Sequence, residues 1–189
     1  IDNGIINNIE YHNQRMHKTR NENFNNEEKI DLNTHIIIPE NYKTGQVKCR
    51  VLYNDKIHKI TFDHYNRKHI KTLKVVCSNS IDYSYKFENR KSLQMLLEQK
   101  EDCDEILIVK NNLVSDTSFS NIVFSTGFRL LTPSTPLLNG TKRQQLLNEQ
   151  KIEEAKITVS DIGSFSKAHL INAMIDLDEV VVDIKNIKL

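Results

Sequence analysis

Residues 105–124 read EILIVKNNLVSDTSFSNIVF, and this stretch decides the fold of the chain. Four of its first six residues, 106–109, form an unbroken apolar run, which is typical of a strand whose two faces are both buried. Asn111-Asn112 then interrupts the run and predicts a tight hairpin turn into Leu113-Val114. A further strand begins at Asn121 in the run NIVF. The stretch therefore predicts a buried sheet formed from consecutive short strands.

Helical and extended segments alternate on either side of this stretch. Before it, NRKSLQMLLEQ at 89–99 predicts a helix, because its leucines fall on one side. After it, Gly127 marks a turn before a short strand at 130–132, and Asn139-Gly140 opens a helix over about 141–150. The chain is expected to close with a short helix and strands at 162–165, 169–174 and 180–184.

The first half of the chain has a different pattern. Residues 8–25 have helical spacing, with Ile9 and Met16 near one face. The segments 47–53 (VKCRVLY) and 56–63 (KIHKITFD) have strand character, and LKVVC at 73–77 follows them. This half therefore predicts a helix followed by an antiparallel meander.

A polar stretch at 78–85 separates the two patterns and predicts a boundary between domains. We expect a small N-terminal α+β lobe over residues 1–80 and a larger C-terminal α+β lobe over residues 81–189. The fold class is α+β, with two small lobes of antiparallel and mixed sheets and a cleft between them. Asn3-Gly4 is typical of a hairpin turn, so we expect the strand before it to be missing from this numbering.

Composition excludes several classes of protein. The 189 residues are 38% hydrophobic and 27% charged with a net charge of +1, which is ordinary for a globular protein and gives no electrostatic footprint for nucleic acid. No apolar run approaches the roughly 18–20 residues of a membrane span. The three isolated cysteines favour a reducing, cytoplasmic setting over a disulfide framework. The seven histidines show no metal-ligand spacing, so we expect no metal site.

Three features could carry chemistry, and each is ambiguous alone. Asn139-Gly140-Thr141 leads into a helix, so free backbone N–H groups and the positive end of the helix dipole could bind a phosphate, although such a sequence is more often a plain turn. Asp116-Thr117-Ser118 offers a carboxylate and hydroxyls beside a strand. Lys86 is one of many lysines, and taken alone it would be a solvated side chain.

The order of these features resembles the fold-type IV pyridoxal-phosphate (PLP) family of class IV aminotransferases and aminodeoxychorismate lyases. A His-x-x-Arg helix comes first in the chain and is followed by a lysine segment and an acid. A small-Asn-Ile segment, a glycine turn into a helix and an Asn-Ala segment near the end come after them. The matching segments are His12–Arg15, Lys86–Arg90, Val114–Asp116, Ser120–Ile122, Asn139–Arg143 and Ile171–Ala173.

The resemblance implies a role for each matched residue, with PLP as the cofactor in the cleft. Lys86 would form the Schiff base with PLP and then move the proton, as the catalytic residue. Asp116 would face the pyridine nitrogen, where the family usually has Glu, and this shorter acid leaves the strength of that contact open. The phosphate would be held by Arg15, by the backbone N–H groups of Thr141 and Lys142, and by Ile171 and Asn172.

The family motifs fix the cofactor better than the reaction. Aminotransferases of this family commonly carry a tyrosine shortly after the lysine, whereas this chain continues Asn89-Arg90-Lys91-Ser92, as in the lyase branch. The resemblance therefore favours 4-amino-4-deoxychorismate lyase, which releases pyruvate and 4-aminobenzoate, a folate precursor. A branched-chain or D-amino-acid aminotransferase and a degenerate, non-catalytic binding protein stay as alternatives. The family also implies a homodimer that acts on a small-molecule amine or amino acid, without nucleic acid or membrane.

Overall fold

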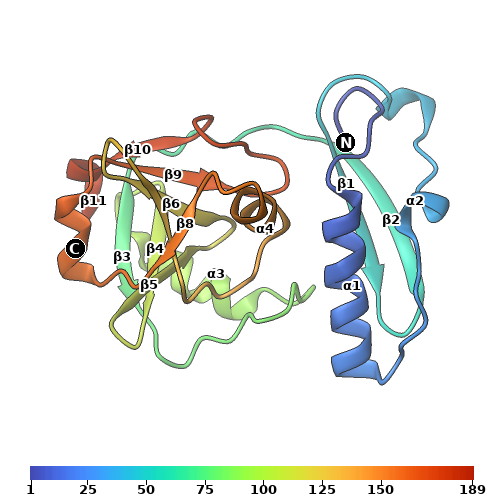
Figure 1. Ribbon diagram of the computed structural model, residues 1–189, viewed down its shortest axis with the longest axis horizontal. Helices are drawn as coiled ribbons and strands as arrows, with labels where there is room; N and C mark the ends of the chain where they lie inside the picture. Colours follow the sequence, from blue (N-terminus) through green and yellow to red (C-terminus); the bar gives the residue numbers. More distant parts are fainter. The chain divides into compact units, whose positions relative to one another are not determined.

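The computed structural model describes residues 1–189 and divides them into two compact units, Ile1–Arg67 and Lys68–Leu189 (Figure 1). The division lies earlier in the chain than the expected boundary after residue 80. Strand β3 (Leu73–Cys77) is the reason, because it hydrogen-bonds to β4 (Glu105–Lys110) in the second unit.

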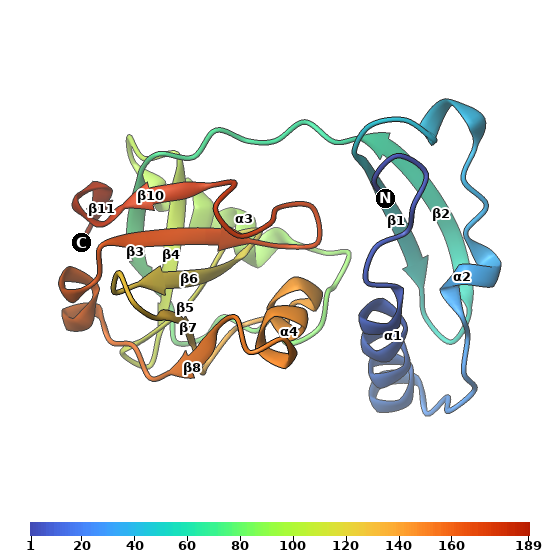
Figure 2. The same ribbon diagram turned by 45° about the horizontal axis from the view of Figure 1, so that its top comes forward.

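The first unit is a helix beside a two-stranded hairpin. Helix α1 (Ile9–Phe24) lies along the antiparallel pair β1 (Val47–Tyr53) and β2 (Ile57–His64), as Figures 1 and 2 both show. These bounds agree with the predicted helix and with the first two predicted strands. The short helices α2 (Leu32–His35) and η1 (Glu40–Tyr42) connect α1 to β1.

Arg20 fixes α1 to the tip of this hairpin. Its side chain is fully buried, and its Nε and Nη2 donate to the Asp55 carbonyl at 3.0 and 2.5 Å. A further N–H of the guanidinium donates to the Glu28 carbonyl. A buried arginine needs such partners, since its five N–H donors are otherwise left without hydrogen bonds. Arg20 is therefore a structural residue of the first unit.

The second unit contains a four-stranded sheet in the order β11-β3-β4-β5. β4 runs parallel to β3 and antiparallel to β5 (Leu113–Thr117), and its first five residues are buried as predicted. Asn111 and Asn112 have φ angles of 51° and 63°, so the predicted hairpin turn is confirmed. The expected meander is wrong at β3, which joins this sheet through a parallel pairing.

A five-stranded sheet in the order β10-β9-β6-β7-β8 completes the second unit, without closing a barrel. The segment between β7 and β8 contains α4, and α3 lies between β3 and β4. The remaining elements are α3 (Lys91–Leu97), η2 (Glu98–Lys100), β6 (Asn121–Ser125), β7 (Leu130–Pro133), α4 (Thr141–Asn148), β8 (Glu153–Ala155), η3 (Val159–Ser164), β9 (Lys167–Ile171), β10 (Val181–Asp183), η4 (Ile184–Asn186) and β11 (Ile187–Lys188).

Two apolar clusters hold the helices of the second unit on its sheets. One joins Leu93 of α3 to Ile106 and Ile108 of β4, and the other joins Leu146 of α4 to Val123 of β6. Burial of such side chains stabilises the fold by about 1.5–3 kcal/mol each. The mixed α+β class expected from the sequence is confirmed.

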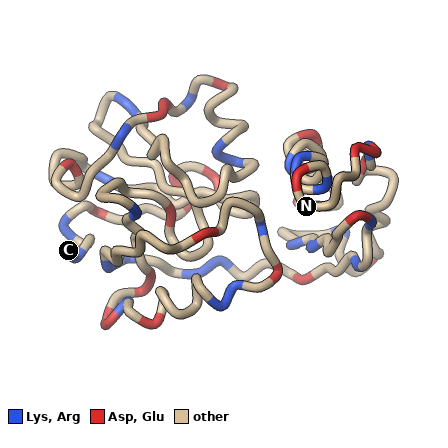
Figure 3. Tube along the Cα trace, turned by 90° about the horizontal axis from the view of Figure 1, so that it is seen from below, with Lys and Arg blue, Asp and Glu red and all other residues tan.

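Charges of both signs are spread along the chain, as Figure 3 shows. This distribution matches the net charge of +1. None of the helices has the length and apolar character needed to span a bilayer.

Candidate active site

Three strand ends of the second unit bring candidate site residues together. Asn121 begins β6 and is paired in register with Ile171, the last residue of β9. The side chain of Asn121 donates from Nδ2 to Asp116 Oδ1 at 2.8 Å, and Asp116 lies near the end of β5. The register of β6 and β9 thus places the predicted acid and the Ile171-Asn172 segment around one asparagine.

Asp116 is a buried acid at the centre of this group. Its side chain accepts the Leu138 N–H at Oδ2 (2.9 Å) in addition to the Asn121 contact. Burial raises the pKa of Asp116 to about 6, against the lowering effect of these two hydrogen bonds and of Arg143. A carboxylate oxygen has two lone pairs, so each can accept one further hydrogen bond. Asp116 is therefore suited to receive a cationic N–H donor.

Gly140 allows the next part of the site to approach Asn121. A Cβ at this position would lie 2.1 Å from Asn121 Oδ1, so only glycine fits. The same glycine is the N-cap of α4 and provides no capping side chain. The first helical hydrogen bond is donated by Gln144, so the N–H groups of residues 141–143 have no acceptor within the helix. These N–H groups and the helix dipole could bind a phosphate, and that role stays a prediction.

The side chains of the first turn of α4 are held by other partners. Lys142 Nζ pairs with Asp176 in the loop after β9 at 2.8 Å, and the Lys142 side chain is only 10% exposed. Thr141 is also buried. The roles predicted for these two residues involve their backbone N–H groups, and the side-chain contacts leave those groups unchanged.

Asn172 follows Ile171 directly and folds back on the loop before β6. Its Oδ1 accepts the Met174 N–H at 2.8 Å, and its Nδ2 points to the Phe119 carbonyl at 3.4 Å. Ile171 is fully buried. Both residues therefore border the Asn121 group, although their predicted contact with a phosphate stays a prediction.

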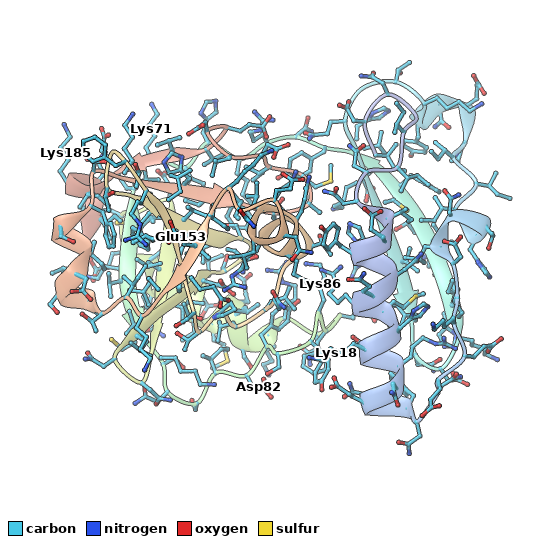
Figure 4. All side chains as sticks on the ribbon, viewed as in Figure 1. Lys18, Lys71, Asp82, Lys86, Glu153 and Lys185 are labelled. Atoms are coloured by element: carbon cyan, nitrogen blue, oxygen red, sulfur yellow. The ribbon has the colours of Figure 1, made fainter.

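Lys86 lies on the irregular segment between β3 and α3, where its side chain is exposed (Figure 4). Figures 1 and 2 draw this segment, α4 and the loop after β9 at the same end of the second unit. Tyr83, close by, uses its hydroxyl to donate to the Phe87 carbonyl at 2.9 Å. The lysine is thus carried by a loop at the end of the unit where the glycine turn lies.

Arg15 is on α1 in the first unit, where its Nη2 lies 3.5 Å from His12 Nδ1. Its predicted contact with a phosphate involves residues of the second unit and stays a prediction.

Four residues near the site were not predicted as parts of it. Asn121 and Arg143 lay inside matched motifs, but their contacts depend on the fold: Arg143 is buried and its Nη2 donates to the Pro133 carbonyl at 2.8 Å and to Glu154. Gly140 was predicted as part of a turn that could bind a phosphate, but its close approach to Asn121 was not predicted. Glu105 is fully buried on β4, and an isolated glutamate in an apolar run, EILIVK, is the signal that could have marked it.

The donor set fits PLP. An exposed lysine, a buried acid and an uncapped helix start lie in one unit, and they would suit the aldehyde, the pyridine nitrogen and the phosphate of PLP. Together with the α+β fold, they define the class of fold-type IV PLP enzymes.

Comparison with known proteins agrees with this class. The model of the class IV aminotransferases matches residues 1–182, and the chain belongs to this family. It is therefore an enzyme of the lyase or aminotransferase kind. An uncharacterized protein of Haemophilus influenzae is 37% identical over 176 residues, covering 92% of this chain and 94% of the relative.

Two solved structures show the same fold. A Haemophilus somnus protein, provisionally named 4-amino-4-deoxychorismate lyase, has a TM-score of 0.86 at 37% identity and covers 94% of each chain. A hypothetical aminotransferase of Mycobacterium tuberculosis in its PLP-bound form has a TM-score of 0.72 at 14% identity, covering 95% of this chain and 75% of that one.

Proposed function

We propose that this enzyme holds PLP through Lys86 and acts as a 4-amino-4-deoxychorismate lyase, releasing 4-aminobenzoate and pyruvate. One observation carries the PLP assignment: Asn121 donates a hydrogen bond to the buried Asp116 carboxylate and lies against Gly140, the N-cap of α4. Asn121 contacts both the acid and the start of the helix. The acid would suit the protonated pyridine nitrogen of PLP, and the N–H groups at the helix start would suit its phosphate. The full-length likeness to the Haemophilus somnus structure supports the choice of reaction.

PLP supplies an electron sink when it is bound, and its pyridine nitrogen draws electrons best when it is protonated. Asp116 would hold that proton on the nitrogen. Its pKa of about 6 leaves it mostly ionised at pH 7.5, so that it can pair with a cation. The N–H groups of Thr141 and Lys142 would bind the phosphate, with Ile171 and Asn172 beside them and Arg15 as a further ligand.

Lys86 would carry the proton transfers of the reaction. In the lyase, its Nζ removes the proton from the ring carbon that bears the amino group. The bond from the ring to the enolpyruvyl oxygen breaks, the ring becomes aromatic, and the side chain leaves as pyruvate after its methylene carbon gains a proton. The reaction balances without water, oxidant or second substrate, so one lysine beside the substrate carbon is sufficient.

The segment after Lys86 favours a lyase over an aminotransferase. The residues that enter α3 are Asn89, Arg90 and Lys91, and none can donate a phenol to the cofactor ring. Of the two tyrosines before Lys86, Tyr83 uses its hydroxyl on the Phe87 carbonyl. An aminotransferase of the branched-chain or D-amino-acid type is the second candidate, favoured by the family model alone.

Product analysis separates these functions. The PLP-loaded protein is incubated with 4-amino-4-deoxychorismate in the absence of any 2-oxo acid, and 4-aminobenzoate and pyruvate are measured over many turnovers. Equal amounts of both products support the lyase. Turnover of an amino acid only when a 2-oxo acid is added supports the aminotransferase and refutes the lyase.

The control for this assay is Lys86→Ala, which keeps the fold but removes the amine. If the wild-type protein binds PLP and neither reaction exceeds the rate of this variant, the protein is a non-catalytic binding module and the proposal is wrong. A homodimer in the reducing cytoplasm fits the family, and sedimentation of the purified protein would test the oligomeric state.

A further inference from the structure

Two charged side chains outside the proposed cofactor ligands meet on Ser118. Glu105 is fully buried on β4, and its carboxylate accepts the Ser118 N–H at 3.2 Å and the Ser118 hydroxyl at 2.9 Å. Arg90 donates from Nη2 to the Ser118 carbonyl at 2.5 Å. The Glu105 carboxylate therefore binds the N–H and hydroxyl of Ser118, and the Arg90 guanidinium binds its carbonyl oxygen.

Residues 117–120 form a compact turn, here called the Ser118 turn, between β5 and β6. The Thr117 hydroxyl accepts the Ser120 N–H at 3.0 Å and lies 2.8 Å from the Ser120 hydroxyl. The turn connects Asp116 directly to Asn121, so its position sets the positions of both. Burying the Glu105 carboxylate is costly unless it is hydrogen-bonded, and the Ser118 turn provides two of its donors.

Arg90 lies on the segment that also carries Lys86. It is the residue before α3 and lies four positions after Lys86 in the same segment. Hydrogen bonds from a charged donor are shorter and stronger than neutral ones, and this contact joins residues 28 apart in the sequence. The Arg90–Ser118 contact thus ties the loop that carries Lys86 to the turn that directly follows Asp116.

We infer that Arg90 is a positioning residue: its hydrogen bond to the Ser118 carbonyl fixes the distance between the Lys86 loop and Asp116. Glu105 stabilises the Ser118 turn through its hydrogen bonds to Ser118. The inference rests on the proposed PLP function, because Lys86 and Asp116 act on the same ring only if their separation is fixed. Lys86 lies on an exposed, irregular loop, and rigid support of reacting groups is what efficient catalysis requires.

The test compares three variants of the full chain. Arg90→Met keeps the length of the side chain and removes its donors, while Arg90→Lys keeps one donor for the carbonyl. Lys91→Met is the matched control, since it removes an exposed cation from the adjacent position. Hydrogen exchange of peptides covering 82–90 is measured without cofactor, and the dissociation constant of PLP is measured from its visible absorbance band. Urea midpoints report the stability of each variant.

Arg90→Met is expected to accelerate exchange in 82–90 and to weaken PLP binding by about tenfold, the effect of losing one hydrogen bond to a charged group. Lys91→Met should match the wild-type protein in both readings, and Arg90→Lys should recover most of the loss. If Arg90→Met does not fold, the comparison of Arg90→Lys with Lys91→Met decides. Faster exchange in 82–90 and weaker PLP binding in Arg90→Lys than in Lys91→Met support the tie, and equal readings in the two variants overturn it.

The inference is overturned if wild-type protein binds PLP and Arg90→Met equals Lys91→Met in exchange and in affinity. It is also overturned if exchange rises uniformly over the whole chain, because Arg90 would then stabilise the fold without positioning the loop. A wild-type protein that shows no visible band with PLP refutes the proposed function instead, so the two failures are distinct.

Discussion

Asp116→Asn tests the electrostatics on which the site depends. The pKa of the buried carboxyl is raised from 3.8 to about 6, mainly by burial, so the native state binds this proton more tightly than the unfolded state. The contribution of Asp116 to the free energy of unfolding is complete below pH 3.8 and is lost as the pH rises through 6. The shift corresponds to about 3 kcal/mol in all, of which about 2 kcal/mol is lost between pH 4.5 and 7.5.

The assay is urea unfolding of cofactor-free wild-type and Asp116→Asn protein at these two pH values. The asparagine does not titrate, so relative to wild type the variant should gain about 2 kcal/mol on going from pH 4.5 to 7.5. In the wild-type protein, Asn121 Nδ2 donates to the Asp116 carboxylate at 2.8 Å. In the variant, the carboxylate is replaced by an amide, which lowers the stability of this contact. That penalty is the same at both pH values and cancels in the difference, as do all other titrating groups.

Parallel stability profiles for the two proteins would refute this reasoning, because they would mean that Asp116 titrates alike in the native and unfolded states. Adding PLP gives a second check. A cation beside Asp116 favours its ionised form, so PLP should stabilise the wild-type protein more at pH 7.5 than at pH 4.5, and should stabilise Asp116→Asn less than wild type at pH 7.5.

Further predictions concern the helix start and a buried histidine. Gly140→Ala should lower the free energy of unfolding by about 1–3 kcal/mol, since its Cβ would overlap Asn121 Oδ1, and should weaken PLP binding; Gly163→Ala, which meets open space, should change stability by no more than about 0.5 kcal/mol in the same urea assay. His169 is buried 2.9 Å from Asp178 without an aligned hydrogen bond, and burial lowers its pKa below 6.5. The native state therefore resists protonation and loses stability as the pH falls through 6.5, so His169→Gln should lose less stability than wild type between pH 7.5 and 5.5; an equal loss in both would contradict the burial argument.

Local patterns in the sequence predicted most of the elements of the second unit. The apolar run at 105–110, the Asn111-Asn112 turn and the glycine turn before residue 141 each depend on a few adjacent residues, and the structure has them where they were expected. The parallel pairing of β3 with β4 was missed, because it joins residues about thirty positions apart and leaves no mark on either strand alone.

The site was predicted only as far as its motifs reached. Matched segments gave Lys86 and Asp116, but the network that surrounds Asp116 depends on long-range contacts. Asn121 and Leu138 meet the acid only after β5 and β6 pair with their sheets, and a sequence pattern cannot show which donors a buried carboxylate finds. The Arg90 contact with Ser118 was missed for the same reason.

The most direct test of the central claim is an absorbance spectrum of the protein incubated with PLP, recorded before and after borohydride reduction, for wild type and Lys86→Ala. The proposed function predicts a visible band in the wild-type protein that borohydride removes, with PLP then fixed on the peptide containing Lys86 in a mass spectrum, and no such band in the variant. An identical spectrum in both proteins, or PLP fixed on another lysine, would contradict the assignment of Lys86 as the cofactor lysine.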